Sequence, residues 1–241
     1  FEQIVDEAAL DQSATAFVAA LSGVFAKLTG FDPEAVGRSK RDRLRAGDPH
    51  PMRAFVDRIG AIFAAPEVDL YLVEDPAVER AEIRPGSPPA LLVPAELEGA
   101  SDPVVAFALA RPLALLAPRL HPLDGVDDAT LAATLVATVR HFEPGFALAG
   151  VPEADLDLEE KRVAKAIGFF SRSKIQDAAT TFAAAPTEDV AGWAARIRTM
   201  ARRAALLVCD DLGAALAALD APLGEDGRAD DLARFWVDDP A

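Results

Sequence analysis

The chain has 241 residues with 24 Lys and Arg, 39 Asp and Glu and 3 His, which gives a formal net charge of −15 and an isoelectric point near 4.6. So acidic a protein lacks the positive field that broad binding to nucleic acids or anionic membranes requires. Its single cysteine, Cys209, excludes an intramolecular disulfide framework and any metal site built from several thiolates. Hydrophobic residues make up 51% of the chain, enough for a core without disulfides or metals.

The ends of the sequence suggest a cytoplasmic fragment of a longer chain. Phe1 is not an initiating Met, and residues 1–7 carry acidic side chains where a signal peptide would carry basic ones. No apolar stretch approaches the roughly 18 residues of a membrane span. We therefore expect no membrane span and a cytoplasmic location.

The N-terminal part of the chain is predicted to be helical. Alanine, the residue with the highest helix propensity, is abundant, and aromatic residues make up only 7%. Apolar residues at a 3.6-residue spacing predict one helix at residues 8–28 and a second at 52–64. Between them lies a run of basic residues, which are Arg38, Lys40, Arg41, Arg43 and Arg45. We interpret this basic run as a solvated face or a set of salt bridges, with docking of an anion or a partner as the alternative.

A sheet is predicted between residues 66 and 95. Val68, Leu70 and Leu72 alternate with other residues in the pattern of a half-buried strand at 68–73. Two further short strands are predicted at 81–84 and 90–93. We expect the three to form a small antiparallel sheet packed on a helical bundle, in an α+β fold that is predominantly helical.

The remainder of the chain is predicted to be helical. The helix at 102–117 begins with Asp102 and Pro103, typical of a helix start, and is almost uncharged apart from Arg111. An apolar surface on all sides indicates a buried helix. Further helices are predicted at 128–142, 159–170, 174–184, 187–208, 212–219 and 228–236.

Most chemical motifs are missing from the sequence. It contains no G-x-S-x-G, no phosphate-binding glycine loop and no pair of histidines four residues apart, so serine hydrolysis, nucleotide chemistry and a helical zinc site are disfavoured. Cys209 lies in an apolar helical run and is interpreted as a core thiol. The acidic stretch 153–160 is interpreted as a loop that supports helix N-termini. Trp193 and Trp236 are attributed to core or interface packing.

One stretch resembles a known peptidase family. The strand-like segments 68–75, 79–86 and 89–97, followed by the apolar helix from Pro103, resemble the pattern that precedes the zinc-binding H-E-x-x-H helix in the CAAX prenyl protease and HtpX-like peptidases. The resemblance covers about residues 52–220 and implies a zincin-like (gluzincin) core. It also implies that residues 51–241 form one pseudo-metallopeptidase-like unit. Residues 1–50 would then form a helical segment joining upstream repeats of the TPR type, beside which similar degenerate domains occur in large bacterial proteins.

The residues that would bind zinc in that family are replaced. The resemblance places its first histidine at Arg111, its catalytic glutamate at Pro112 and its second histidine at Leu115. On the helix of the third ligand it places that glutamate at Arg198 and a following aspartate at Arg202. Arginine has no lone pair to give a metal, and the side chains of leucine and proline donate nothing. The resemblance therefore implies neither a metal nor another cofactor.

Three functional hypotheses follow. The leading one is a non-catalytic pseudopeptidase that serves as a structural or protein-interaction module with a protein partner. The second is an anion-binding domain or a non-zinc enzyme that uses Arg111, Arg198 and Arg202 in the former cleft. The third is a helical scaffold unrelated to peptidases. This hypothesis would be favoured if residues 68–93 formed no strands.

Arg111 gives an internal test of the predicted packing. A buried arginine without a partner is costly, so a carboxylate should meet it. The sequence offers four candidates without choosing between them, which are Glu96, Glu98, Asp210 and Asp211.

Overall fold

The computed structural model describes residues 11–219 and 226–238. The first helix, α1 (Gln12–Leu28), begins directly after Asp11, whose carboxylate accepts hydrogen bonds from the backbone N–H groups of Ser13 and Ala14. Such capping satisfies donors that have no partner inside the helix. Residues 8–10, which were also predicted to be helical, lie outside the described residues.

The sheet contains all three predicted strands, β1 (Asp69–Val73), β2 (Glu82–Arg84) and β3 (Ala90–Pro94), in the order β1-β3-β2. The prediction of an antiparallel sheet is wrong, because β1 pairs with β3 in parallel and only β2 pairs with β3 in the antiparallel sense. The chain leaves β1, crosses to the far edge to form β2, and then returns through residues 85–89 to place β3 in the middle. The strand patterns themselves carry no information about this crossover.

The remaining α-helices agree with most predictions. They are α2 (Pro51–Ile62), α3 (Asp102–Leu113), α4 (Pro122–Gly125), α5 (Asp128–Phe142), α6 (Glu153–Ala166), α7 (Arg172–Ala184), α8 (Val190–Cys209), α9 (Leu212–Leu219) and α10 (Gly227–Asp238). Short 3-10 turns, η2 (Pro33–Val36), η3 (Ala95–Gly99) and η4 (Phe169–Ser171), occur between them. The predicted loop at 153–160 is instead the start of α6, where acidic side chains suit the positive end of the helix dipole.

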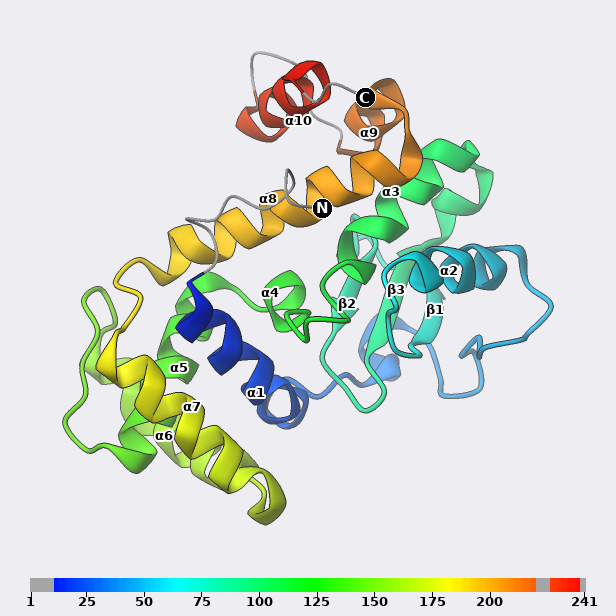
Figure 1. Ribbon diagram of the computed structural model, residues 1–241. Coiled ribbons are helices and arrows are strands. Elements are labelled where there is room, and N and C mark those ends of the chain that lie inside the picture. Colours follow the sequence, from blue (N-terminus) through cyan, green and yellow to red (C-terminus); the bar gives the residue numbers. More distant parts are fainter. Residues whose placement is uncertain (1–10, 220–225, 239–241) are drawn as a thin grey trace.

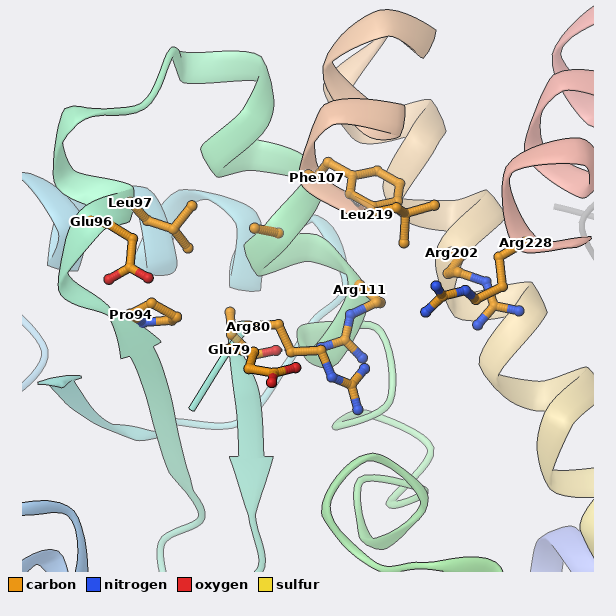
Figure 2. A pocket seen from close by; sticks show the side chains of 13 residues that line it. Glu79, Arg80, Pro94, Glu96, Leu97, Phe107, Arg111, Arg202, Leu219 and Arg228 are labelled. Atoms are coloured by element: carbon orange, nitrogen blue, oxygen red, sulfur yellow. The ribbon is translucent and has the colours of Figure 1, made fainter. Parts of the chain in front are cut away.

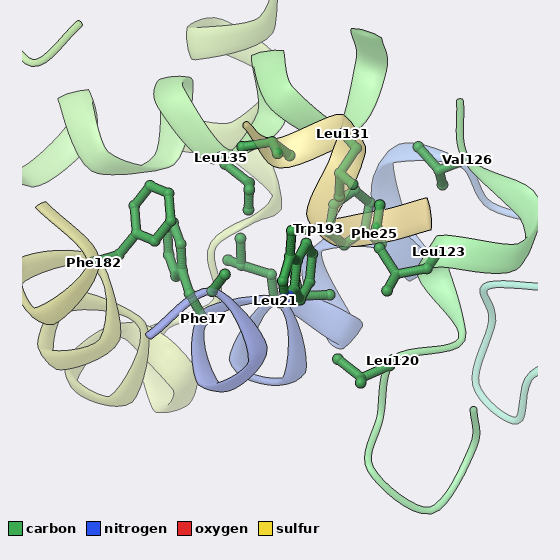
Figure 3. Close-up of a cluster of buried hydrophobic side chains, with 14 of the residues drawn as sticks. Phe17, Leu21, Phe25, Leu120, Leu123, Val126, Leu131, Leu135, Phe182 and Trp193 are labelled. Atoms are coloured by element: carbon green, nitrogen blue, oxygen red, sulfur yellow. The ribbon is translucent and has the colours of Figure 1, made fainter. Parts of the chain in front are cut away.

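A helical core fills one half of the molecule (Figure 1). Side chains from α1, α4, α5, α6, α7 and α8 form one buried cluster. Phe17 of α1 packs on Phe182 of α7, with ring centroids 5.1 Å apart, and Trp193 of α8 is fully buried among them (Figure 3). α1 is thus packed into the same body as α5–α8.

A second core lies between the sheet and the helices α2, α3, α9 and α10. Helix α8 contributes to both cores, since Trp193 and Ile197 lie in the helical core while Leu206 and Cys209 lie in the sheet core. Figure 1 shows α8 as the long helix running from the helical half to α9 and α10. The two halves therefore share one helix as a common structural element.

Candidate functional site

Helix α3 places Arg111 beside the sheet. The helix begins after Ser101 and buries Phe107, Leu109 and Leu113 in the sheet core. Arg111 lies in its last turn and is 7% exposed. A guanidinium at this depth needs hydrogen-bond partners for most of its N–H groups.

Asp124 of α4 is the ion-pair partner of Arg111. Its Oδ1 accepts from Nη1 of Arg111, while Nη2 of Arg111 donates to the carbonyl oxygen of Ala81. The other carboxylate oxygen, Oδ2, accepts from the backbone N–H of Ile83 at 2.9 Å. This buried cluster ties α3, α4 and β2 together. A carboxylate does meet Arg111, as predicted, but it is none of the four acids that the sequence suggested.

The contact between α4 and β2 depends on a glycine. A Cβ atom at Gly125 would lie 2.6 Å from the carbonyl oxygen of Ile83. Helix α4 can therefore approach β2 closely enough to form the Asp124 hydrogen bonds only because residue 125 has no side chain. The segment Leu123-Asp124-Gly125, an acid beside a glycine in apolar sequence, was the signal that sequence reasoning missed.

The positions at which the resemblance places two of the zinc ligands, Arg111 and Leu115, lie in different surroundings. Helix α3 ends at Leu113, after which Leu115 and Leu116 donate to carbonyl oxygens three residues back. The predicted helix ran to residue 117 and would have placed positions 111 and 115 on one face. Instead Leu115 lies in the helical core, whereas Arg111 lies at the sheet. Pro112, which has no N–H to donate, stands at this break.

Arg198 binds residues in α4 and at the start of α5. Its Nη1 lies 2.8 Å from Oδ1 of Asp128, and its Nε donates to the carbonyl oxygen of Leu123 at 2.7 Å. It therefore supports the start of α5. The two guanidiniums bind different parts of the α4 segment, Arg198 at the carbonyl oxygen of Leu123 and Arg111 at the carboxylate of Asp124.

Arg111 and Arg202 do line a common cavity of about 570 Å³ (Figure 2). It is bounded by the end of β3, by η3, and by helices α3, α8, α9 and α10. Four arginines and two glutamates provide its charge, which are Arg80, Arg111, Arg202, Arg228, Glu79 and Glu96. Apolar atoms come from Pro94, Leu97, Phe107, Ala108, Ala218 and Leu219. The cavity has the size and mixed lining that are typical of small-ligand sites.

Arg202 has few partners in this cavity. Its Nη2 donates to Oγ1 of Thr199, one turn earlier in α8, at 2.7 Å. Its Nε is buried and finds no hydrogen-bond partner in the described part of the chain. Within residues 11–219 and 226–238, no carboxylate lies at ion-pair distance from its guanidinium. Burial lowers the pKa of Arg202 to about 10, so it still carries its charge at neutral pH.

The basic run of residues 38–45 forms a loop beside β1. Arg38 pairs with Glu74 at 3.1 Å, and Arg43 pairs with Asp69 at 2.8 Å. Leu44 is joined to Leu70 of β1 by backbone hydrogen bonds, which hold the loop against the sheet. The side chains of Lys40, Arg41 and Arg45 are exposed. The two ion pairs follow the interpretation of this run as a solvated face with salt bridges.

The three histidines lie apart. His121 is buried at the start of α4, and burial lowers the pKa of its imidazole to about 4. His50 caps α2 through Nδ1, and His141 lies near Arg172 at the end of α5. No group of three or more His, Cys, Asp or Glu side chains that could hold a metal is found among the described residues.

Comparisons with protein-family models, with curated proteins and with solved structures find no match. In the part of the chain that the structure describes, none of the helices has the length and apolar character to cross a membrane.

Proposed function

We propose that this domain is a non-catalytic module related to the CAAX prenyl protease and HtpX-like peptidases, and that it serves as a structural or protein-interaction unit of a larger cytoplasmic protein. Arg111 is the observation that carries the proposal. At the position of the first histidine ligand stands a guanidinium that is engaged by Asp124 and by the carbonyl oxygen of Ala81. It holds α3 on α4 and β2, and it has no lone pair for a metal.

The end of α3 supports the same proposal. Two ligands four residues apart share a metal only if they lie on one helical face. Because α3 ends at Leu113, Leu115 lies in the other core. A histidine restored at position 115 would still be separated from position 111, so the geometry as well as the donors departs from that of a working peptidase.

A role in contacts is supported by η4, between α6 and α7. Phe169 and Phe170 are 88% and 100% exposed, and their rings contact each other in a T-shaped arrangement with centroids 5.6 Å apart. Adjacent exposed aromatic side chains are typical of surfaces that meet another protein.

Metal analysis of the purified protein tests the proposal. We expect less than about 0.1 equivalent of zinc after dialysis against a weak chelator, because a catalytic zinc site needs three protein ligands. A variant carrying H50N and H141N controls for adventitious binding at the two more accessible imidazoles. About one equivalent of zinc retained by both proteins would contradict the proposal.

A second candidate function is anion binding in the former cleft. It is favoured by the shared cavity of Arg111 and Arg202, and it no longer includes Arg198, which is bonded to Asp128 and Leu123. A ligand of this cavity does not require the kinship with peptidases.

A further inference from the structure

Of the four arginines that line the cavity between α3, α8 and the sheet, two have close ion-pair partners and two do not among the described residues. Arg111 is paired with Asp124, and Arg228 is paired with Asp226. Arg80 has only a 3.9 Å contact with Asp124, whose Oδ1 already accepts from Arg111, and its side chain is 56% exposed. Arg80 and Arg202 therefore keep N–H groups for a ligand.

Arg202 is half-buried and has no ion-pair partner among the described residues, so we expect it to lower the stability of the fold. Transfer of a cation from water to a protein interior without a carboxylate partner is unfavourable, and a buried N–H without an acceptor adds to that cost. Among the described residues its guanidinium donates only to Thr199 on its own helix, and Asp226 and Asp231 act on its charge from beyond ion-pair distance. Groups held in such costly surroundings inside a cleft are candidates for a binding role.

The remaining lining indicates the class of anion. Glu79 and Glu96 lie at the same cavity and form no ion pair within the described residues, and Figure 2 shows Glu96 on the side away from Arg202. Two nearby carboxylates would repel the two charges that a phosphate dianion carries on one group more strongly than the single charge of one carboxylate group. Phe107, Leu97 and Leu219 offer an apolar surface for a carbon chain attached to the anionic group. A planar carboxylate also matches the paired N–H groups of a guanidinium.

We propose that this cavity binds a carboxylate through Arg202, with Arg80 as a second donor and with the carbon chain of the ligand against Phe107 and Leu219. The carboxylate belongs either to a small dicarboxylic acid or to an acidic side chain of a peptide. This inference rests on the second candidate function, anion binding in the same cavity, and names the class of ligand. It requires neither the peptidase kinship nor the loss of a metal.

Calorimetric titration of the full chain tests the inference. The probes are glutarate, a peptide of four glutamates blocked at both ends, and inorganic phosphate, each at low ionic strength because salt screens such contacts. We expect one of the two carboxylate probes to bind with a Kd below about 1 mM and phosphate to bind at least about tenfold more weakly. Which carboxylate probe binds distinguishes a metabolite site from a peptide site.

Variants assign the binding to the cavity. Arg202→Met keeps most of the stem and removes the charge, so we expect at least about a tenfold loss of affinity, as for a lost charged hydrogen bond. Arg41→Met is the matched control, because Arg41 is exposed in the loop beside β1. Glu96→Gln should tighten binding about twofold or more, since it removes a repulsive charge.

Thermal unfolding shows whether each variant is folded, so that a loss of affinity can be attributed to the substituted side chain. R202M is expected to melt at the same temperature as the parent or a few degrees higher, because it removes a half-buried cation that has no ion-pair partner among the described residues. The inference is overturned if neither carboxylate probe binds, if phosphate binds more tightly than both, or if R41M loses as much affinity as a folded R202M. Zinc analysis is independent of all these outcomes.

Discussion

At the scale of single residues, the ion pair of Arg111 and Asp124 is a buried contact that joins α3, α4 and β2. Both side chains are buried. Arg111 also donates to the carbonyl oxygen of Ala81, and Asp124 also accepts from the backbone N–H of Ile83. A buried pair is weak evidence of stability when compared with an apolar pair, but the loss of one partner is costly. Mutation can separate the loss of one partner from the replacement of both partners by apolar residues.

Asp124→Asn should lower the free energy of unfolding by about 3–5 kcal/mol, because it leaves the guanidinium of Arg111 buried without a charge partner. Urea denaturation followed by circular dichroism measures this. Asp128→Asn is the matched control, since its pair with Arg198 is partly exposed and should contribute about 1 kcal/mol or less. The double variant R111M/D124L should recover part of the loss. Equal effects of D124N and D128N would show that the Arg111 pair has no special role.

His121 should make stability depend on pH. Its imidazole is buried, and its Nδ1 has no hydrogen-bond partner among the residues that the structure describes. Burial together with nearby Arg119 lowers its pKa to about 4, against the opposing effect of Asp124. Between about pH 4 and pH 6.5 the unfolded chain therefore binds the proton more readily, so stability falls as the pH decreases through this window.

The comparison of wild type with His121→Gln isolates this effect. The stability that wild type loses between pH 7 and pH 5 should exceed the loss in H121Q by about 2 kcal/mol, which corresponds to about 1.5 pKa units. Urea unfolding at the two pH values provides the measurement, and the carboxylates that also titrate there are common to both proteins. Parallel losses in the two proteins would mean that His121 is protonated as easily in the fold as in the unfolded chain.

At the scale of elements, the sequence predicted what depends on local pattern. The spacing of apolar residues located α5 and α9 to the residue, because each is an amphipathic or apolar run between helix-ending signals. The same patterns located the three strands. They could not give the parallel pairing of β1 with β3, because the direction of pairing depends on the path of residues 74–89 and not on the strands themselves.

The candidate site was predicted less well, and α3 shows why. Its apolar character extends beyond Leu113, so periodicity extended the helix to residue 117 and aligned Leu115 with Arg111. The hydrogen bonds change to a three-residue spacing after Pro112, and that turn sends Leu115 into the helical core. The pairing of Arg111 with Asp124 and the cavity around Arg202 arise from contacts between elements far apart in the sequence. Composition and residue spacing do not predict such contacts.

At the scale of the whole molecule, helix α8 decides how the two cores are coupled. Its first half is buried in the helical core and its second half in the sheet core. A helix that loses one half of its packing exposes apolar side chains and retains less support for its remaining turns. Unfolding of either core should therefore destabilise the other, and the protein should unfold as one cooperative unit.

Two natural probes can test this coupling, one in each core. Trp193 is fully buried in the helical core, and Trp236→Phe leaves it as the single fluorescent tryptophan. Cys209 is buried in the sheet core, where burial raises the pKa of its thiol and slows its reaction with a thiol reagent. In W236F, the urea midpoints from Trp193 fluorescence and from pulse labelling of Cys209 should agree within about 0.3 M, as two-state unfolding requires. If Cys209 reacts at urea concentrations that leave the fluorescence of Trp193 unchanged, the sheet half opens by itself and α8 does not couple the cores.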